Sequence, residues 1–282
     1  NDDFNNEHST DLMEGTIDQT ELSNPRPFNR GGFGQIFVAT WHETDVAVKA
    51  LPADIAHTTP HQLRSFKEEV RLLSKLAHPN IVQYLGCVHE RPIAVGGRER
   101  WSLVTEFIQR GSLYDVIRKT EPQRLTWRRR VEIAFGTALG MHYLHSMKVL
   151  HLDLKSLNVL IGRDFSPKIC DFGLSRQGVA SSAADSADPS NAVGGGENEP
   201  PMGTWEWMAP EVLRGEVPRR SADVYSYGIM LYELCALDIP YRHVRHKRLL
   251  LHLVGREDMR PGIPTGCEPA WSDLMIRCWA SV

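Results

Sequence analysis

Residues 151–161, HLDLKSLNVLI, place an acid, a base and an amide in a short polar stretch that runs directly into an apolar one. The three polar side chains are Asp153, Lys155 and Asn158. The apolar end, residues 159–161, predicts a short buried strand. We therefore expect the polar residues in a loop that is held against a core. Loops fixed in this way often carry binding or catalytic groups.

The composition bounds the class of protein. The chain has 282 residues, 41% of them hydrophobic and 24% charged, which is typical of a soluble globular protein with one large domain or two lobes. The net charge of -3, without a basic face that contains aromatic residues, argues against nucleic acid as a partner. The five cysteines are widely spaced and favour a reducing compartment. No stretch approaches the roughly 18 apolar residues of a membrane span, so we expect a cytoplasmic protein.

The regions of the chain differ in character. The first 24 residues contain seven acidic side chains and no Lys or Arg, which predicts an acidic arm over residues 1–21, either mobile or a loose lead-in strand. Short β-rich runs follow between residues 28 and 104 and predict an antiparallel sheet. One amphipathic helix interrupts them, with Thr59 as its candidate cap and Pro79 as its stop.

Long helices are expected after residue 111. The clearest are residues 127–147 and residues 221–237, and the second is apolar on nearly every side, which predicts a buried central helix. Between them, residues 175–201 are rich in Ser, Ala, Gly and Pro and predict a mobile loop. A basic run at residues 242–248 is expected to be solvated surface, with partner docking as the alternative.

Closely spaced glycines occur in NRGGFGQIF, residues 29–37. Glycine lets the backbone approach a phosphate without interference from a Cβ atom. An ordinary hairpin turn is the alternative interpretation, because Asn29 stands where the first glycine of a G-x-G-x-x-G motif would fall.

A lysine stands in an apolar strand. Lys49 in VAVKA requires an anionic partner, because an unpaired ammonium is costly to bury. Glu69 is the candidate, since Phe66 and Leu73 share its helix face. The alternative is that Lys49 and Glu69 are two unrelated surface charges.

A second acid follows the opening stretch at Asp171, in CDFGLS. The oxygens of Asn158 and Asp171 are hard ligands suited to Mg²⁺, which is held by few protein groups together with substrate phosphates. Asp153 is then left as a base. The segment GTWEWMAPE, residues 203–211, follows the predicted mobile loop.

Taken together, these motifs resemble the eukaryotic protein kinase family over about residues 22–280. The resemblance implies an α+β, bilobal protein kinase fold. Its parts would be a β-rich N-lobe with one main helix at residues 22–105, a hinge at 106–111, a mainly helical C-lobe at 112–282 and a long activation segment at 171–211. The wording of the motifs is most similar to the tyrosine-kinase-like group, whose members mostly phosphorylate serine and threonine.

The resemblance also implies the nucleotide-binding residues. Lys49, paired with Glu69, would hold the α- and β-phosphates of ATP. The residues similar to the glycine-rich lid are Gly31, Gly32, Phe33 and Gly34. The residues expected around adenine and ribose are Ile36, Ala47, Thr105 as gatekeeper, Glu106 and Ile108 at the hinge, Asp115 and Leu160.

The catalytic roles follow in the same way. Asp153 would accept or orient the proton of the substrate hydroxyl, and Lys155 would steady the γ-phosphate. Asn158 and Asp171 would hold Mg²⁺. Lys155 and Thr204 resemble the residues of Ser/Thr kinases rather than tyrosine kinases. The implied function is transfer of the γ-phosphoryl group of Mg-ATP to Ser/Thr hydroxyls of a protein substrate.

Besides Asn29, three features depart from the family pattern. Leu152 replaces the arginine that usually binds a phosphate on the activation loop, so we expect activity that does not need this phosphate. The sequence stops at RCWASV, before the arginine that pairs with the A-P-E glutamate, so we expect Glu211 to be buried without its partner, at a cost of roughly 3 to 5 kcal/mol. The long activation segment carries serines that are either phosphosites or part of a permissive insertion: Ser181, Ser182, Ser186 and Ser190.

Two other functions remain open. The first is a pseudokinase or scaffold that keeps the fold with little turnover. The second is a small-molecule phosphotransferase similar to antibiotic and choline kinases, which lack the GTxxWMAPE platform present here. The sequence leaves the identity of the protein substrate and the oligomeric state undetermined.

Overall fold

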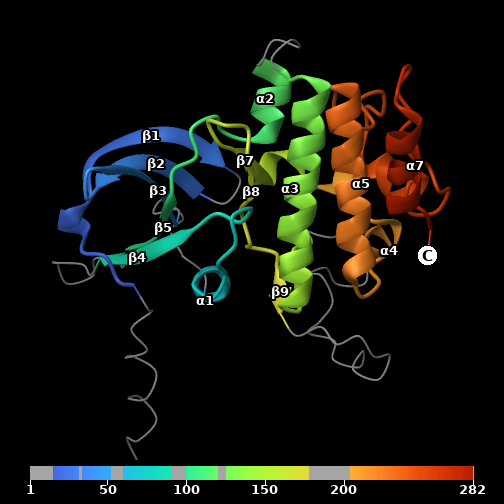
Figure 1. Cartoon of the computed structure of the whole chain (residues 1–282). Helices are drawn as coiled ribbons and strands as arrows, with labels where there is room; N and C mark the ends of the chain where they lie inside the picture. Colours follow the sequence, from blue (N-terminus) through green and yellow to red (C-terminus); the bar gives the residue numbers. More distant parts are fainter. Residues whose placement is uncertain are drawn as a thin grey trace, which may run out of the picture. The chain divides into compact units, whose positions relative to one another are not determined.

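The computed structural model describes residues 15–31, 34–51, 60–90, 100–119, 125–177 and 204–281, which divide into two compact units (Figure 1). Unit 1 consists of the residues up to Ala77 together with Val82–Ile108. Unit 2 consists of His78–Ile81 and the residues from Gln109 onward. Unit 1 is built on a sheet and unit 2 mainly on helices, which confirms the predicted bilobal α+β kinase fold.

Unit 1 contains a five-stranded antiparallel sheet in the order β1-β2-β3-β5-β4. Alternation along β3 places Val46 and Val48 in the core and turns Lys49 toward the opposite face. The strands are β1 Ser23–Gly31, β2 Gly34–Trp41, β3 Thr44–Ala50, β4 Tyr84–Glu90 and β5 Arg100–Glu106.

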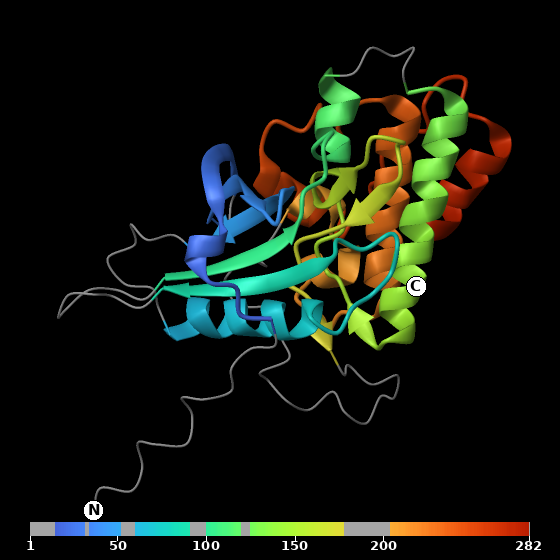
Figure 2. The same cartoon turned by 60° about the vertical axis from the view of Figure 1, so that its left-hand side comes forward.

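Helix α1, Pro60–Leu73, runs along one face of this sheet (Figure 2). Its apolar side chains Phe66, Val70 and Leu73 are buried, as their spacing predicts. The ring centroids of Phe66 and of Trp101 on β5 are 6.4 Å apart. The candidate cap Thr59 lies outside the described residues.

Residues 15–21 pack onto unit 1 instead of forming the expected loose lead-in. Thr16 forms a parallel bridge with Cys87, and Ile17 is 4% exposed within the core of the sheet. The short 3-10 helix η1, Gln19–Glu21, follows with Asp18 as its cap. Burial of the Ile17 side chain accounts for the difference, because it outweighs the polar character of its neighbours. The rest of the predicted arm, residues 1–14, lies outside the described residues.

Unit 2 is organised around helix α5, Arg220–Ala236, which lies beside α3 and α7 (Figure 1). Ile229, Met230 and Leu231 are all fully buried, which confirms the prediction of a central helix. The other helices are α2 Leu113–Lys119, α3 Trp127–Ser146, η2 Ser156–Asn158, η4 Trp205–Trp207, α4 Pro210–Leu213, α6 Lys247–Leu253 and α7 Pro269–Cys278. The strands, in two antiparallel pairs, are β6 Val149–Leu150, β7 Val159–Ile161, β8 Pro167–Ile169 and β9 Arg176–Gln177.

Residues His78–Ile81 belong to unit 2, although the sequence places them inside the N-lobe. The Asn80 side-chain amide donates to the carbonyl of Pro167 at 2.9 Å, and the Asn80 carbonyl accepts from the Ile169 N–H at 2.9 Å. These bonds satisfy the backbone of β8 at its open edge, so they attach the turn after α1 to unit 2.

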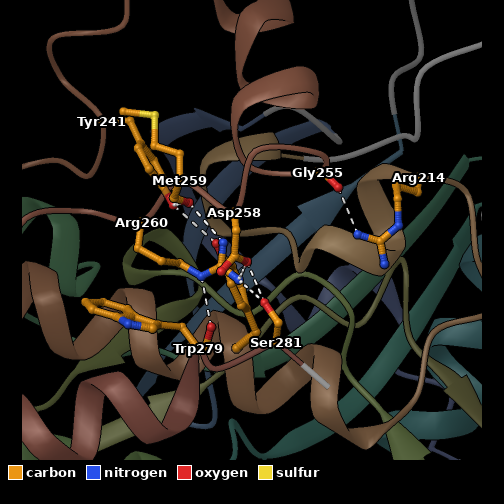
Figure 3. Close-up of polar contacts among 9 residues, drawn as sticks. Arg214, Tyr241, Gly255, Asp258, Met259, Arg260, Trp279 and Ser281 are labelled. Atoms are coloured by element: carbon orange, nitrogen blue, oxygen red, sulfur yellow. Dashed lines mark hydrogen bonds and ion pairs between the residues drawn. The ribbon is translucent and has the colours of Figure 1, made fainter.

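Arg260 fixes the end of the described chain (Figure 3). Its guanidinium donates to the carbonyl of Trp279 at 2.9 Å, to the carbonyl of Met259 at 3.0 Å and to the carboxylate of Asp258 at 2.7 Å. The hydroxyl of Ser281 also lies within 3.2 Å of this guanidinium. The segment after α7 is thereby tied to the connection between α6 and α7.

Glu211 corrects a prediction from the sequence. It is half-buried rather than fully buried, and one carboxylate oxygen accepts from the Ser221 hydroxyl at 3.4 Å. The Glu211 carboxylate therefore has a polar partner, and the full penalty expected for an unpartnered buried charge does not apply.

Candidate active site

The loop of residues 151–158 is attached to helix α5 by a buried carboxylate. Asp223, in the first turn of α5 and 1% exposed, accepts from the N–H groups of His151 at 2.9 Å and Leu152 at 2.8 Å. The oxygen that accepts from His151 also lies 2.8 Å from Nε2 of the His145 ring. Leu152 has a φ of 62°, which is strained for a residue other than glycine. The hydrogen bonds to Asp223 hold this conformation.

Asp153, Lys155 and Asn158 come together in this loop, and each is less than one-tenth exposed. One carboxylate oxygen of Asp153 accepts from the Lys155 ammonium at 2.6 Å and from the Asn158 amide at 2.9 Å. The same amide nitrogen donates to the Asp153 carbonyl at 2.8 Å. The structure thus brings the acid, the base and the amide of the sequence motif into one hydrogen-bonded cluster.

Lys155 also joins this cluster to the segment of residues 204–211. Its ammonium donates to the Thr204 hydroxyl at 2.7 Å. Thr204 immediately precedes η4, so the contact fixes the start of that short helix.

The donor set around Asn158 fits a magnesium ion. Because both bonds of the Asn158 amide nitrogen go to Asp153, its amide oxygen points away from them. The backbone N–H of Cys170 donates to the backbone carbonyl of Asn158 at 2.9 Å. This bond ties the residue before Asp171 to Asn158. Across the described ranges no three His, Cys, Asp or Glu side chains gather as a metal site. Two protein oxygens suit Mg²⁺, which takes its other ligands from phosphates and water.

In unit 1 the predicted ion pair between Lys49 and Glu69 is present. The Lys49 ammonium lies 2.9 and 3.1 Å from the two oxygens of Glu69. The Glu69 side chain is 6% exposed and that of Lys49 21% exposed. The alternative of two unrelated surface charges is therefore wrong.

The described part of the glycine-rich stretch lies at the end of β1 and in β2. Gly31 pairs with Gly34 in the antiparallel register, and Ile36 lies opposite Lys49. Gly32 and Phe33 lie outside the described residues. Ala47 on β3 pairs with Thr105 on β5.

The residues predicted for the hinge lie at the end of β5 and just after it. The Glu106 carboxylate accepts from the Gln83 N–H at 2.8 Å, and Ile108 is buried. In unit 2, Asp115 accepts from the Ser112 hydroxyl at 2.7 Å, and Ser112 forms a bridge with Leu160. Asp115 and Leu160, predicted for ribose and adenine, are thus drawn to one region of unit 2.

The sequence did not predict a second buried carboxylate of α5, besides Asp223, that contacts the loop of residues 151–158. Glu233 of α5 is 1% exposed, and its two oxygens accept from the Ser156 hydroxyl at 2.6 Å and from the Trp207 indole N–H at 2.7 Å. Burial raises the pKa of Glu233 to about 7, against the opposing effect of these hydrogen bonds. The available signal was a single acid in the apolar run GIMLYELCAL.

Among the residues that the structure describes, no helix has both the length and the apolar character needed to cross a bilayer.

The family model described as "Protein tyrosine and serine/threonine kinase" matches residues 22–282. This span contains every candidate site residue named above.

Individual relatives agree with this match. The chain is 40% identical over 272 residues to the probable serine/threonine-protein kinase SIS8 of Arabidopsis thaliana and 34% identical over 280 residues to the serine/threonine-protein kinase CTR1 of the same organism. These alignments cover 95% and 98% of this chain but only 24% and 31% of the relatives. The serine/threonine/tyrosine-protein kinase HT1, also from Arabidopsis thaliana, is 32% identical over 269 residues, which is 95% of this chain and 63% of HT1. The chain therefore belongs to the protein tyrosine and serine/threonine kinase family.

Proposed function

We propose that this chain transfers the γ-phosphoryl group of Mg-ATP to serine and threonine hydroxyls of protein substrates. The observation that carries the proposal is the cluster in which Lys155 bonds both Asp153 and Thr204. It supports Ser/Thr specificity because a lysine two residues after the catalytic acid, with a threonine from the peptide platform, is the arrangement implied by the resemblance. SIS8 and CTR1 are both named as serine/threonine-protein kinases, which favours the same specificity.

Asp153 is suited to act on the proton of the substrate hydroxyl. Lys155 and Asn158 both bond to one oxygen of its carboxylate, which fixes the orientation of the other. A carboxylate fixed in this way can accept or orient a hydroxyl proton. The Lys155 ammonium, beside the same carboxylate, would steady the γ-phosphate as its charge develops.

The resemblance implies nucleotide-binding roles for residues of each unit. Asn158 and Asp171 would ligate Mg²⁺, which when bound neutralises charge on the phosphate oxygens. Lys49, oriented by Glu69, would bind the α- and β-phosphates. The glycine-rich stretch would cover the phosphates, and the residues expected around adenine and ribose would bind those parts of ATP, as the resemblance implies.

A protein substrate is favoured over a small molecule. The segment of residues 204–211 is held to the loop of residues 151–158 through Thr204 and through Trp207, so it offers a fixed surface for a peptide beside Asp153. Antibiotic and choline kinases lack this segment.

The proposal is tested by measuring transfer of radiolabelled phosphate to a peptide array for the wild type and for Asp153→Ala. Loss of a positioned base is expected to lower the rate roughly 10² to 10⁴-fold. Asp273→Asn, an exposed acid on α7, is the matched control and is expected to keep full activity. Nucleotide binding by calorimetry shows that each variant is folded. If the wild type and Asp153→Ala are equally inactive but bind nucleotide, the chain is a scaffold.

A further inference from the structure

We propose that Cys235 and Cys267 are a covalent modification site, at which a peroxide converts two neighbouring thiols into a reversible disulfide. The bond would join the last turn of helix α5 to the turn that precedes helix α7. The proposal goes beyond the proposed kinase function and does not rest on it, so its test needs no phosphate transfer.

The two side chains contact each other, although 32 residues separate them in the chain. A hydrogen bond joins the thiol groups of Cys235 and Cys267. Both cysteines are free thiols and both are half-buried. A disulfide requires two sulfurs that can approach to about 2 Å. A hydrogen-bonded pair of thiols therefore needs only a small movement to form one.

The packing of α7 against α5 places the two cysteines beside each other (Figure 1). Leu231 lies one helical turn before Cys235, and its carbonyl accepts from the Trp271 indole N–H at 3.2 Å. Trp271 is in the first turn of α7, and its backbone N–H donates to the carboxylate of the cap residue Glu268 at 3.2 Å. Cys267 immediately precedes this cap. The bond from Trp271 to α5 therefore holds the turn before α7 near the end of α5.

The turn that carries Cys267 has room to move. The Cys267 N–H donates to the Pro264 carbonyl at 3.1 Å, which closes the turn. Within it, Gly266 has a φ of 76°, and nothing lies within 4 Å of a Cβ atom at this position. A shift of this turn can thus bring the Cys267 sulfur onto the Cys235 sulfur without repacking α5.

The surroundings give the two thiols different roles. Burial raises the pKa of Cys235 to about 12, together with the hydrogen bond to the Cys267 sulfur and its charge. The Arg130 guanidinium, which donates to the Cys235 carbonyl at 3.2 Å, opposes this rise. Cys235 therefore stays protonated at neutral pH. Because the thiolate is the reactive form of cysteine, Cys267 is the sulfur that reacts first with an oxidant.

The reaction balances with hydrogen peroxide as the oxidant. The Cys267 thiolate attacks one peroxide oxygen, so that an S–O bond forms, the O–O bond breaks and hydroxide leaves to take up the proton that Cys267 released. The Cys235 sulfur then attacks the Cys267 sulfur, so that the S–S bond forms and the S–O bond breaks. The departing hydroxide takes the Cys235 proton and leaves as water. In total, two thiols are oxidised to one disulfide and one peroxide is reduced to two waters.

The disulfide can also be reduced again. Both sulfurs are half-buried, so a thiolate in solution can reach the bond and exchange with it. Accessible disulfides are the labile and regulatory kind, whereas structural ones resist reduction. We therefore expect a modification that peroxide makes and a thiol reductant removes.

The experiment treats the reduced protein with dilute hydrogen peroxide, counts its thiols after denaturation and maps linked peptides by mass spectrometry. The five thiols of the wild type should fall to three, with Cys235 linked to Cys267 inside one molecule. Dithiothreitol should restore all five. Cys235→Ser and Cys267→Ser should each give no linked peptide. A wild type without this link, or with a link that joins two molecules, would overturn the proposal.

Cys278 supplies the matched control. It is also half-buried, lies on α7 and has Arg277 as its neighbouring charge. Cys278→Ser removes one thiol and keeps the pair, so its count should fall from four to two, with the same linked peptide. Loss of the link in this variant would show that the pair is wrongly assigned.

A second measurement uses the wild type alone, so it decides the question even if a serine variant does not fold. Phenylarsine oxide releases water when its arsenic bonds to two thiols, and the chelate resists displacement by a monothiol. The reduced protein should retain the arsenical in 2-mercaptoethanol, lose it to dithiothreitol and show Cys235 and Cys267 protected from alkylation. Release by the monothiol, or alkylation of both cysteines while the arsenical is present, would mean that the two thiols do not act as a pair.

Discussion

At the scale of single residues, the ion pair between Lys49 and Glu69 allows unit 1 to bury two charged side chains. Lys49 stands in a strand whose neighbours are apolar, and both oxygens of Glu69 lie within 3.1 Å of its ammonium. With Glu69 only 6% exposed, neither charge is fully hydrated. Removing one member of such a pair costs more than the pair itself contributes, because the other charge is left uncompensated.

This cost can be separated from the expected role of Lys49 in ATP binding. We expect Lys49→Met to lower the free energy of unfolding by about 3 kcal/mol, the lower end of the range for buried pairs because Lys49 is partly exposed. The double variant Lys49→Met/Glu69→Met should recover most of this stability and none of the phosphate transfer. Urea denaturation and radiolabelled transfer test the two parts. A double variant no more stable than the single one would contradict the pairing.

At the scale of elements, close approach of backbone strands decides whether residues 15–17 can pack on β4. Gly86 of β4 faces the Gly15 carbonyl and the Ile17 side chain, so a Cβ atom there would collide with the Gly15 oxygen and lie 2.7 Å from Ile17. The Cys87 N–H donates to the Gly15 carbonyl at 3.0 Å, and the Ile17 N–H donates to the Cys87 carbonyl at 2.9 Å. The lack of a side chain at Gly86 permits this pairing.

Gly86→Ala is therefore expected to displace residues 15–17 from β4. The free energy of unfolding should fall by about 1 to 3 kcal/mol, as in other overpacked cores. The Cys87 amide should exchange faster, because its acceptor is displaced. Hydrogen exchange and urea denaturation measure both effects. Gly262→Ala is the control, since nothing lies within 4 Å of a Cβ atom there, and equal exchange of Cys87 in both variants would argue against the collision.

At the scale of the whole molecule, Glu233 links stability to pH. Burial raises its pKa from 4.5 to about 7. Between these values the folded protein keeps a proton that the unfolded chain has released, so the unfolded state binds fewer protons. The free energy of unfolding therefore falls as pH rises through this window. The contribution is complete below about pH 4.5 and absent above about pH 7.

Glu233→Gln removes this linkage while keeping the shape of the side chain. We expect the free energy of unfolding of the wild type, taken relative to Glu233→Gln, to fall by roughly 3 kcal/mol between about pH 5 and pH 8. Urea denaturation of both proteins at several pH values gives this difference, in which other titrating groups cancel. Parallel pH profiles would show that the Glu233 pKa is not raised.

The sequence by itself determined the three longest helices, the order of the motifs and the local pairing of charges. Hydrophobic spacing placed α1, α3 and α5, and the apolar surroundings of Lys49 required the partner that Glu69 supplies. These features depend on period and on short separations, which a single chain displays directly. Asp153, Lys155 and Asn158 lie within six residues, so their clustering was also predictable.

Tertiary structure alone decided which distant groups meet. It placed Asn80 in unit 2, packed Ile17 into the core of unit 1 and left Glu211 half-buried. It also brought Glu233 to Ser156, 77 residues away, and to Trp207, 26 residues away. Helical periodicity indicates that a side chain is buried, but the polar group that faces it is set by how elements pack across long separations, which no local pattern records.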